Sequence, residues 1–198
     1  MSAATLDAES QPVRVVAQHA IGRDAMWLYI VGDLFIFGGW FVFYLVYRAM
    51  EPAVFFASQA QLDQTTGMVN TLILLVSSWL VALSVNAARS DRHDQATRYA
   101  LLTLLAGAMF AALKLYEWTS AVAEGHTFTS NDFFMFYYFL TGVHLLHLLC
   151  GLLVLAMLAR HLRTPALRSQ VVIENCAAYW HMIDLLWVVM FALLYVMR

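Results

Sequence analysis

The chain has 198 residues, of which 62% are hydrophobic and 12% are charged, and its mean hydropathy is +0.69. An average soluble domain has about a quarter charged residues, so the composition excludes an ordinary soluble domain. The formal net charge is −2 and the only lysine is Lys114, which argues against disorder and against nucleic-acid binding. Two cysteines are too few for a disulfide scaffold. The composition therefore predicts a polytopic membrane protein.

Five apolar stretches have the length of a membrane-spanning helix. A helix needs about 20 apolar residues to cross the hydrocarbon core, and a spanning segment must satisfy its own backbone hydrogen bonds. The strands of a membrane barrel would alternate over about 10 residues, and no such segment is visible. We therefore predict an all-α helical bundle with five transmembrane helices, at Trp27–Tyr47, Asn70–Ala88, Tyr99–Trp118, Phe134–Ala159 and Ala177–Met197.

The segments outside these stretches predict one domain. Residues 1–25 are polar or mixed and lack the pattern of a removable signal peptide, so we expect a cytoplasmic tail followed by a five-helix domain over residues 26–198. The connection 49–69 contains Phe55 and Phe56 and predicts a short interfacial helix. Gly107 and Ala111 lie at helical spacing. They either allow two helices to approach closely or reflect the general abundance of small residues in membrane spans.

The arginines predict the orientation of the bundle. Basic residues concentrate in the short cytoplasmic loops of membrane proteins. Arg48 and Arg198 lie on one predicted side, and all other arginines lie on the opposite side. We therefore predict a multi-pass protein of the bacterial inner membrane, with a cytoplasmic N-terminus and the C-terminus outside. The cytoplasmic arginines would be Arg14, Arg23, Arg89, Arg92, Arg98, Arg160, Arg163 and Arg168.

Several ionisable side chains fall inside the predicted helices, where each costs free energy. Lys114 and Glu117 are three residues apart and can pair on one helix face. Alternatively, the lysine snorkels and the glutamate meets water. His181 and Asp184 have the same spacing, and an aspartate can orient a histidine. Asp33 has no oppositely charged neighbour in its own helix, so it must be neutral, hydrogen-bonded or paired with another helix or subunit.

His144 and His147 share one helix face and could be half of a metal site or supply haem ligands together with His181. A metal site needs more ligands, however, and no Cys-x-x-Cys-His haem attachment exists. Histidines that hydrogen-bond between helices are the favoured interpretation. No motif of a soluble enzyme is present. We therefore expect no catalytic residue, metal or cofactor site in this chain.

The polar residues also form an ordered pattern. The fourth predicted helix carries T-G-x-H-x-x-H, and the fifth carries E-x-x-x-x-Y-W-H-x-x-D-x-x-W. Over roughly residues 27–197 the sequence resembles subunit III of the haem–copper oxidases. It is most similar to the short five-helix branch, which includes proteins associated with nitric oxide reductase.

The resemblance implies candidate residues for a proton network or for subunit packing. Asp33 stands where the family has a membrane-embedded carboxylate, usually glutamate, and Asn70 matches an Asn-Thr pair. Glu117 matches an acid at a helix end, whereas Lys114 departs from the usual glutamine. The two histidine positions and the last-helix motif supply the other candidates, namely His144, His147, Glu174, Tyr179, Trp180, His181, Asp184 and Trp187.

The resemblance further implies a non-catalytic, non-redox subunit of a bacterial respiratory complex. The family packs against catalytic subunit I, which holds the haem and copper, with subunit II as a further neighbour, and it binds phospholipid in a cleft. It supports assembly, turnover stability and proton uptake while cytochrome c or quinol is oxidised and oxygen is reduced. Longer members have two further N-terminal helices.

Three other functions remain open at this point. The chain could be an accessory protein of a nitric oxide reductase in denitrification. It could be a stand-alone transporter or proton conductor that uses Asp33, Lys114 and Glu117. It could also be a b-type cytochrome that uses His144 or His147 together with His181.

Overall fold

The computed structural model describes the backbone of residues 11–165 and 168–197, and the side chains from residue 24 onward. Within these ranges the chain is helical and contains no strand. The elements are α1 (Gln11–Met50), α2 (Pro52–Gln59), α3 (Gln64–Arg89), α4 (His93–Ala123), α5 (Asp132–Arg163), α6 (Gln170–Phe191) and the π-helix η2 (Ala192–Val196).

The described residues form five helices that are long and apolar enough to cross a membrane, which confirms the predicted all-α five-span bundle. Each helix begins before its predicted apolar stretch, and α1, α3, α4 and α5 also end beyond theirs, because a helix ends where its terminal backbone groups find partners rather than where hydrophobicity falls. Asp63 caps α3 by accepting a hydrogen bond from the Thr65 backbone at 2.9 Å. Asn131 caps α5 in the same way through the Phe134 backbone at 3.0 Å.

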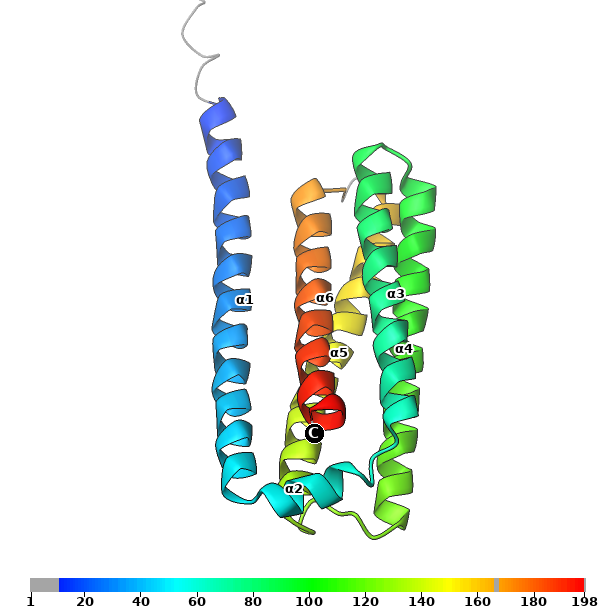
Figure 1. Ribbon diagram of the computed structural model, residues 1–198. Helices are drawn as coiled ribbons and strands as arrows, with labels where there is room; N and C mark the ends of the chain where they lie inside the picture. Colours follow the sequence, from blue (N-terminus) through cyan, green and yellow to red (C-terminus); the bar gives the residue numbers. More distant parts are fainter. Residues whose placement is uncertain (1–10, 166–167, 198) are drawn as a thin grey trace, which may run out of the picture.

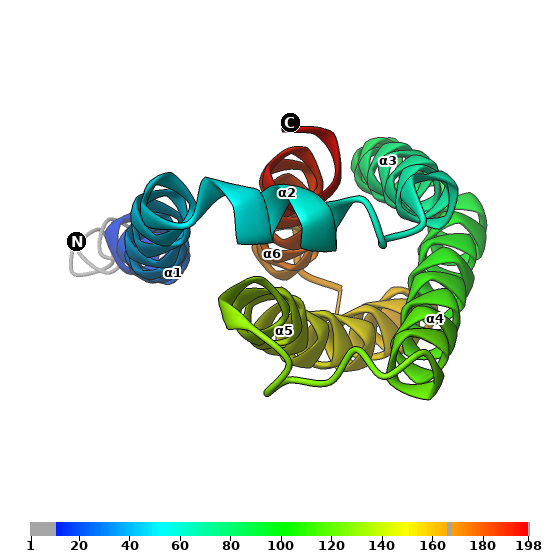
Figure 2. The same ribbon diagram turned by 60° about the horizontal axis from the view of Figure 1, so that its bottom comes forward.

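The start of α1 and the short helix α2 refine the boundaries predicted for the N-terminal part of the chain. Helix α1 already includes residues 11–25, which were assigned to the tail, while residues 1–10 lie outside the described part. The predicted short helix in the connection 49–69 is confirmed as α2, which begins at Pro52. Figure 2 shows α2 crossing the end of the bundle between α1 and α3. The Phe55 side chain is buried and Phe56 is exposed, so α2 is anchored through one face.

Helix α6 is central, and α1 lies at the edge. Figures 1 and 2 show α3, α4 and α5 arranged in an arc on one side of α6, with α1 on the opposite side. Helix α1 contacts α6 and, less extensively, α5. Accordingly α6 is the most buried of the spans and α1 the least.

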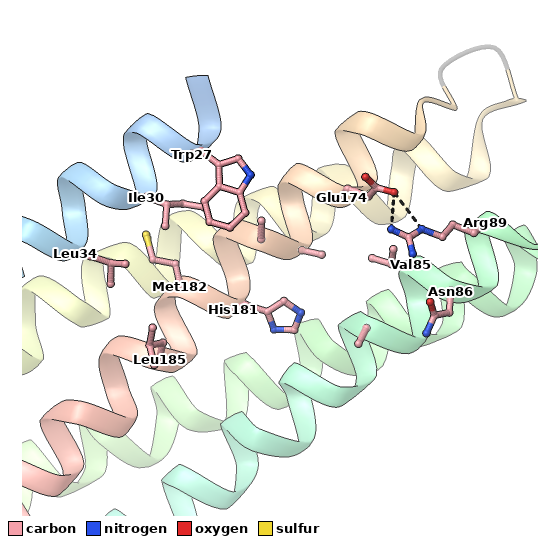
Figure 3. A pocket seen from close by; sticks show the side chains of 13 residues that line it. Trp27, Ile30, Leu34, Val85, Asn86, Arg89, Glu174, His181, Met182 and Leu185 are labelled. Carbon is pink, nitrogen blue, oxygen red and sulfur yellow. Dashed lines mark hydrogen bonds and ion pairs between the residues drawn. The ribbon is translucent and has the colours of Figure 1, made fainter. Parts of the chain in front are cut away.

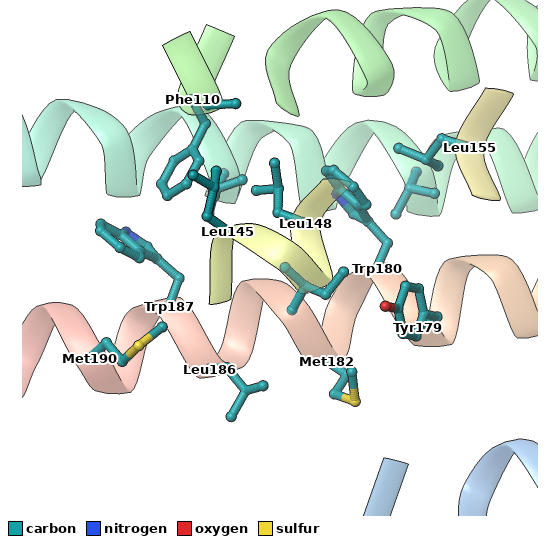
Figure 4. Close-up of a cluster of buried hydrophobic side chains, with 14 of the residues drawn as sticks. Phe110, Leu145, Leu148, Leu155, Tyr179, Trp180, Met182, Leu186, Trp187 and Met190 are labelled. Carbon is teal, nitrogen blue, oxygen red and sulfur yellow. The ribbon is translucent and has the colours of Figure 1, made fainter. Parts of the chain in front are cut away.

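The core is organised around two tryptophans of α6. Trp180 and Trp187 are fully buried, and Figure 4 shows them on the side of α6 that faces Phe110, Leu145 and Leu148. A Cβ atom on Gly107 would lie 2.6 Å from Trp180 Cη2. The Trp180 indole therefore requires this glycine, which supports the close-approach interpretation of Gly107.

Candidate functional site

A buried polar cluster joins α4, α5 and η2. The Lys114 Nζ atom lies 3.2 Å from Glu117 Oε1, 3.0 Å from the Tyr137 hydroxyl and 2.7 Å from the Tyr195 hydroxyl. The Tyr137 hydroxyl donates to Glu117 Oε1 at 2.6 Å, and the Tyr195 hydroxyl donates to the same oxygen. The Lys114 and Glu117 side chains are only 1% and 7% exposed. We call these four residues the lysine cluster.

The lysine cluster confirms the predicted Lys114–Glu117 pair, and the alternative of a snorkelling lysine is wrong. All three donors of an ammonium group find acceptors. The rings of Tyr137, Trp187 and Tyr195 surround Nζ at 4.5, 5.2 and 5.4 Å. Cation–π attraction is strongest where water is excluded. Sequence reasoning missed Tyr137 and Tyr195. The available signal was that a buried tyrosine hydroxyl needs a hydrogen-bond partner.

Asp33 pairs with His147 across the α1–α5 contact. Asp33 Oδ1 lies 3.4 Å from His147 Nε2, and the two side chains are 11% and 19% exposed. His147 Nδ1 lies 2.8 Å from the Val143 carbonyl oxygen. A carbonyl can only accept, so Nδ1 carries a proton and Nε2 faces the carboxyl group. A carboxylate also only accepts, so this contact becomes a hydrogen bond only when a proton lies on Nε2 or on the carboxyl group.

His144 lies in different surroundings from His147. Its ring is buried against Phe110 and Trp187, with centroid distances of 5.8 and 5.3 Å. Neither ring nitrogen has a hydrogen-bond partner among the described residues. The two histidines therefore do not act as one pair, since His144 faces the core and His147 faces α1.

The expected contact between His181 and Asp184 is replaced by a contact with α3. The Ser78 hydroxyl lies 2.7 Å from His181 Nδ1 and is also close to Asp184. Asp184 is buried, and neither carboxylate oxygen has a hydrogen-bond partner in the described ranges. The expected contact followed from the residue spacing within one helix, whereas the nearer partner of His181 comes from the neighbouring helix α3.

Comparison with known proteins shows to which family this chain belongs. The model of the family described as "Cytochrome c oxidase subunit III" matches residues 13–198. This chain belongs to the cytochrome c oxidase subunit III family. It is 31% identical over 173 residues to a cytochrome c oxidase subunit 3 from Synechocystis, which covers 86% of this chain and 73% of the relative.

Two further relatives are named for different complexes. A "Cytochrome bo(3) ubiquinol oxidase subunit 3" from Pseudomonas aeruginosa is 29% identical over 195 residues, which is 90% of this chain and 92% of the relative. A "Heme-copper oxidase subunit I+III" from Aeropyrum pernix is 28% identical over 182 residues, which is 87% of this chain and 22% of the relative.

The last-helix residues of this subunit III chain hold α6 against its neighbours. Trp180 Nε1 donates to Ser77 Oγ at 2.7 Å, and Trp187 Nε1 donates to Thr71 Oγ1 at 3.0 Å. The Tyr179 hydroxyl donates to the His147 carbonyl at 3.2 Å. Glu174 accepts from Arg89 at 2.8 and 3.1 Å. Asn70 is also buried, but its amide has no hydrogen-bond partner in the part of the chain described.

An apolar groove of about 530 Å³ is lined by side chains of α1, α3 and α6. Trp27, Leu34 and Leu185 contribute apolar walls, and the Arg89–Glu174 ion pair lies at one end. Figure 3 shows the His181 ring among the side chains that line this groove. An apolar wall with a charged end matches the two parts of an amphiphilic molecule such as a lipid.

The histidines and acids are dispersed among these clusters. Within the described ranges, no three His, Cys, Asp or Glu side chains are grouped so that they could hold a metal ion. His147 and His181 each contact a side chain from another helix. These two histidines therefore form interhelical contacts.

Proposed function

We propose that this chain is the non-redox subunit III of a bacterial haem–copper oxidase in the inner membrane. It packs against catalytic subunit I, with subunit II nearby, and it supports assembly, turnover stability and proton uptake. The observation that carries the proposal is the family match over residues 13–198. The Aeropyrum relative supports subunit I as the partner, because its name places subunits I and III in one chain.

Relatives of this chain are named as subunits of both cytochrome c and ubiquinol oxidases. The proposed complex therefore oxidises either cytochrome c or quinol and reduces oxygen. Haem and copper belong to subunit I, where the electron transfer and the coupled proton translocation take place. The role of this chain is to keep the complex intact and supplied with protons.

The Asp33–His147 pair is the best candidate for a role in proton uptake. It places a carboxyl group 3.4 Å from an imidazole nitrogen within membrane-spanning helices, and both kinds of group can take up and release a proton. The pair lies where the edge helix α1 contacts α5. In the lysine cluster, by contrast, each N–H donor of the Lys114 ammonium group already has an acceptor.

The groove between α1, α3 and α6 is the proposed phospholipid site. Its apolar walls accept an acyl chain, and Arg89 and Asn86 lie in its lining near the ends of α3 and α6 where a headgroup would be. A lipid held there fills the gap between the edge helix and the rest of the bundle.

The test compares Asp33→Ala with Asp184→Asn in the assembled oxidase. We measure the turnover number, the protons pumped per electron and the rate of inactivation during turnover. We expect Asp33→Ala to slow turnover at high pH, where protons are scarce, and to speed inactivation. Gly38→Ala, at a position of α1 where an added methyl group meets no atom within 4 Å, is the control for an altered helix.

If both aspartate variants match wild type in all three measurements while subunit I still co-purifies, the role in proton uptake is wrong. The polar groups would then act only in helix packing. If subunit I does not co-purify even with the wild-type chain, the assignment to the oxidase fails before the proton role is reached.

A further inference from the structure

We infer that the α3–α4 turn, the first turns of α4 and the α5–α6 connection form a binding site for a phosphate group, separate from the groove beside α1. The site is a polar hollow of about 550 Å³. It is lined by residues of the α3–α4 turn, the first turns of α4 and the connection to α6, namely Asp91, Arg92, His93, Asp94, Gln95, Arg98 and Arg168.

Three guanidinium groups from two separate connections line this one hollow. Arg92 and Arg98 come from the start of α4, and Arg168 comes from the α5–α6 connection. None of the three has a carboxylate partner within the described residues. Arg168 donates through Nε to the Leu162 carbonyl at 3.0 Å, which fixes the side chain and leaves its terminal nitrogens available.

The acidic residues of the hollow do not neutralise it. Asp91 Oδ1 lies 3.7 Å from His93 Nε2. Asp94 lies in the first turn of α4, where the helix dipole stabilises a negative charge. Three arginines against two aspartates leave the hollow with a positive formal charge, and an anion that bridges the arginines lowers their mutual repulsion.

The shape of the donors favours phosphate. A guanidinium group presents parallel N–H donors that match two oxygens of one phosphate. The hollow lies at the start of α4 beside the α5–α6 connection, on the side that the arginine distribution predicts to be cytoplasmic. Basic pockets at this level of a membrane protein bind anionic lipid headgroups. The phosphate comes either from such a headgroup or from a soluble phosphate compound.

The experiment uses the full chain in lipid nanodiscs. The variant Arg92→Gln/Arg98→Gln removes two charges from the hollow. The matched variant Arg160→Gln/Arg163→Gln removes two charges from exposed positions at the end of α5, outside the hollow. One arm measures the preference of the chain for spin-labelled phosphatidylglycerol over phosphatidylcholine. The other arm measures binding of inorganic pyrophosphate by calorimetry in phosphatidylcholine nanodiscs.

We expect the hollow variant to lower the preference for phosphatidylglycerol by about fivefold or more, and the matched variant to change it by less than about twofold. Loss of pyrophosphate binding in the hollow variant alone would instead identify a soluble phosphate compound as the source. An equal loss in both variants, or no loss in either arm, would overturn the inference, because it would mean that only diffuse surface charge is present. Unchanged thermal unfolding of both variants excludes a folding defect.

Discussion

At the scale of single residues, the most unusual feature is a lysine buried inside a membrane protein. An ionised side chain at the centre of a membrane-spanning helix costs about 2.5–3.5 kcal/mol on insertion scales. Lys114 offsets this cost with three hydrogen bonds and with the adjacent carboxylate of Glu117.

The lysine cluster predicts strong coupling between its two charges. Lys114→Met leaves Glu117 buried without its partner and should lower the free energy of unfolding by about 3–5 kcal/mol. Lys114→Met/Glu117→Leu removes both charges and should cost much less than the single substitution. Equilibrium unfolding of the three proteins in mixed detergent micelles measures the difference. Equal losses for the single and double variants would show that the two charges are not coupled.

A second residue-scale prediction concerns the cap of α3. The hydroxyl of Thr66 donates to Asp63 at 2.5 Å and, against a smaller effect of burial, lowers the pKa of this carboxyl group below its ordinary value of 3.8. The lower folded-state pKa stabilises the fold fully above pH 3.8, and this stabilisation is lost as the pH falls through the lowered pKa.

Asp63→Ala should therefore cost about 1 kcal/mol at neutral pH, and the difference from wild type should shrink in acid. Asp63→Asn keeps a cap that does not titrate and is the control. Unfolding measured as a function of pH checks the prediction. A difference between wild type and Asp63→Ala that does not change down to strongly acidic pH would contradict it.

The sequence predicted contacts within one helix better than contacts between helices. Lys114 and Glu117 are three residues apart, so helix geometry alone brings them together. The partners of His181 and His147 are Ser78 and Asp33, which are distant in sequence. The relative rotation and height of neighbouring helices determine such contacts, and a single sequence does not contain that information in its spacing.

At the scale of elements, hydrophobic length was sufficient to find every span. The helix ends could not be predicted as well, because caps such as Asp63 lie in polar segments that hydropathy ignores. The π-helix η2 was also missed. A π-helix is rare and local, and here it places Tyr195 against Lys114 and Gly67.

Close packing of α4 against α6 gives an element-scale prediction. Gly107→Ala places a methyl group 2.6 Å from Trp180 Cη2 and should destabilise the bundle by about 1–3 kcal/mol. Gly38→Ala on α1 meets no atom within 4 Å and should be neutral or stabilising, since alanine favours helix by about 1 kcal/mol. Unfolding of both variants in the same detergent checks this. Stabilisation by Gly107→Ala would show that the indole packs elsewhere.

At the scale of the whole molecule, the arginine distribution predicts that the α3–α4 turn faces the cytoplasm. Ser90→Cys lies at this turn, and Thr129→Cys lies in the exposed α4–α5 connection at the opposite end. Cys150 and Cys176 are replaced by alanine in both variants. A membrane-impermeant maleimide added to intact spheroplasts should label position 129 and should label position 90 only after permeabilisation. The reverse pattern would invert the predicted topology.

Helix α1 lies at the edge of the bundle, and its outward side chains are exposed. The exposed fractions of Leu28 and Phe35 are 77% and 83%. Among the described helices, this arrangement leaves one span held mainly through α6 and α5. Such an arrangement suits a subunit that completes its packing within a larger complex. The sequence implied this role only through the family resemblance, because hydropathy does not distinguish a lipid-facing side from a subunit-facing side.

The measurement that tests the central claim most directly is purification of the tagged full chain from native membranes in a gentle detergent. The same sample is analysed by a reduced-minus-oxidised absorbance spectrum and by mass spectrometry of its partners. We predict that haem absorbance and a catalytic subunit I co-purify with the chain, and the identity of that partner names the complex. A folded chain that is purified alone and without haem absorbance would contradict the assignment as subunit III of an oxidase.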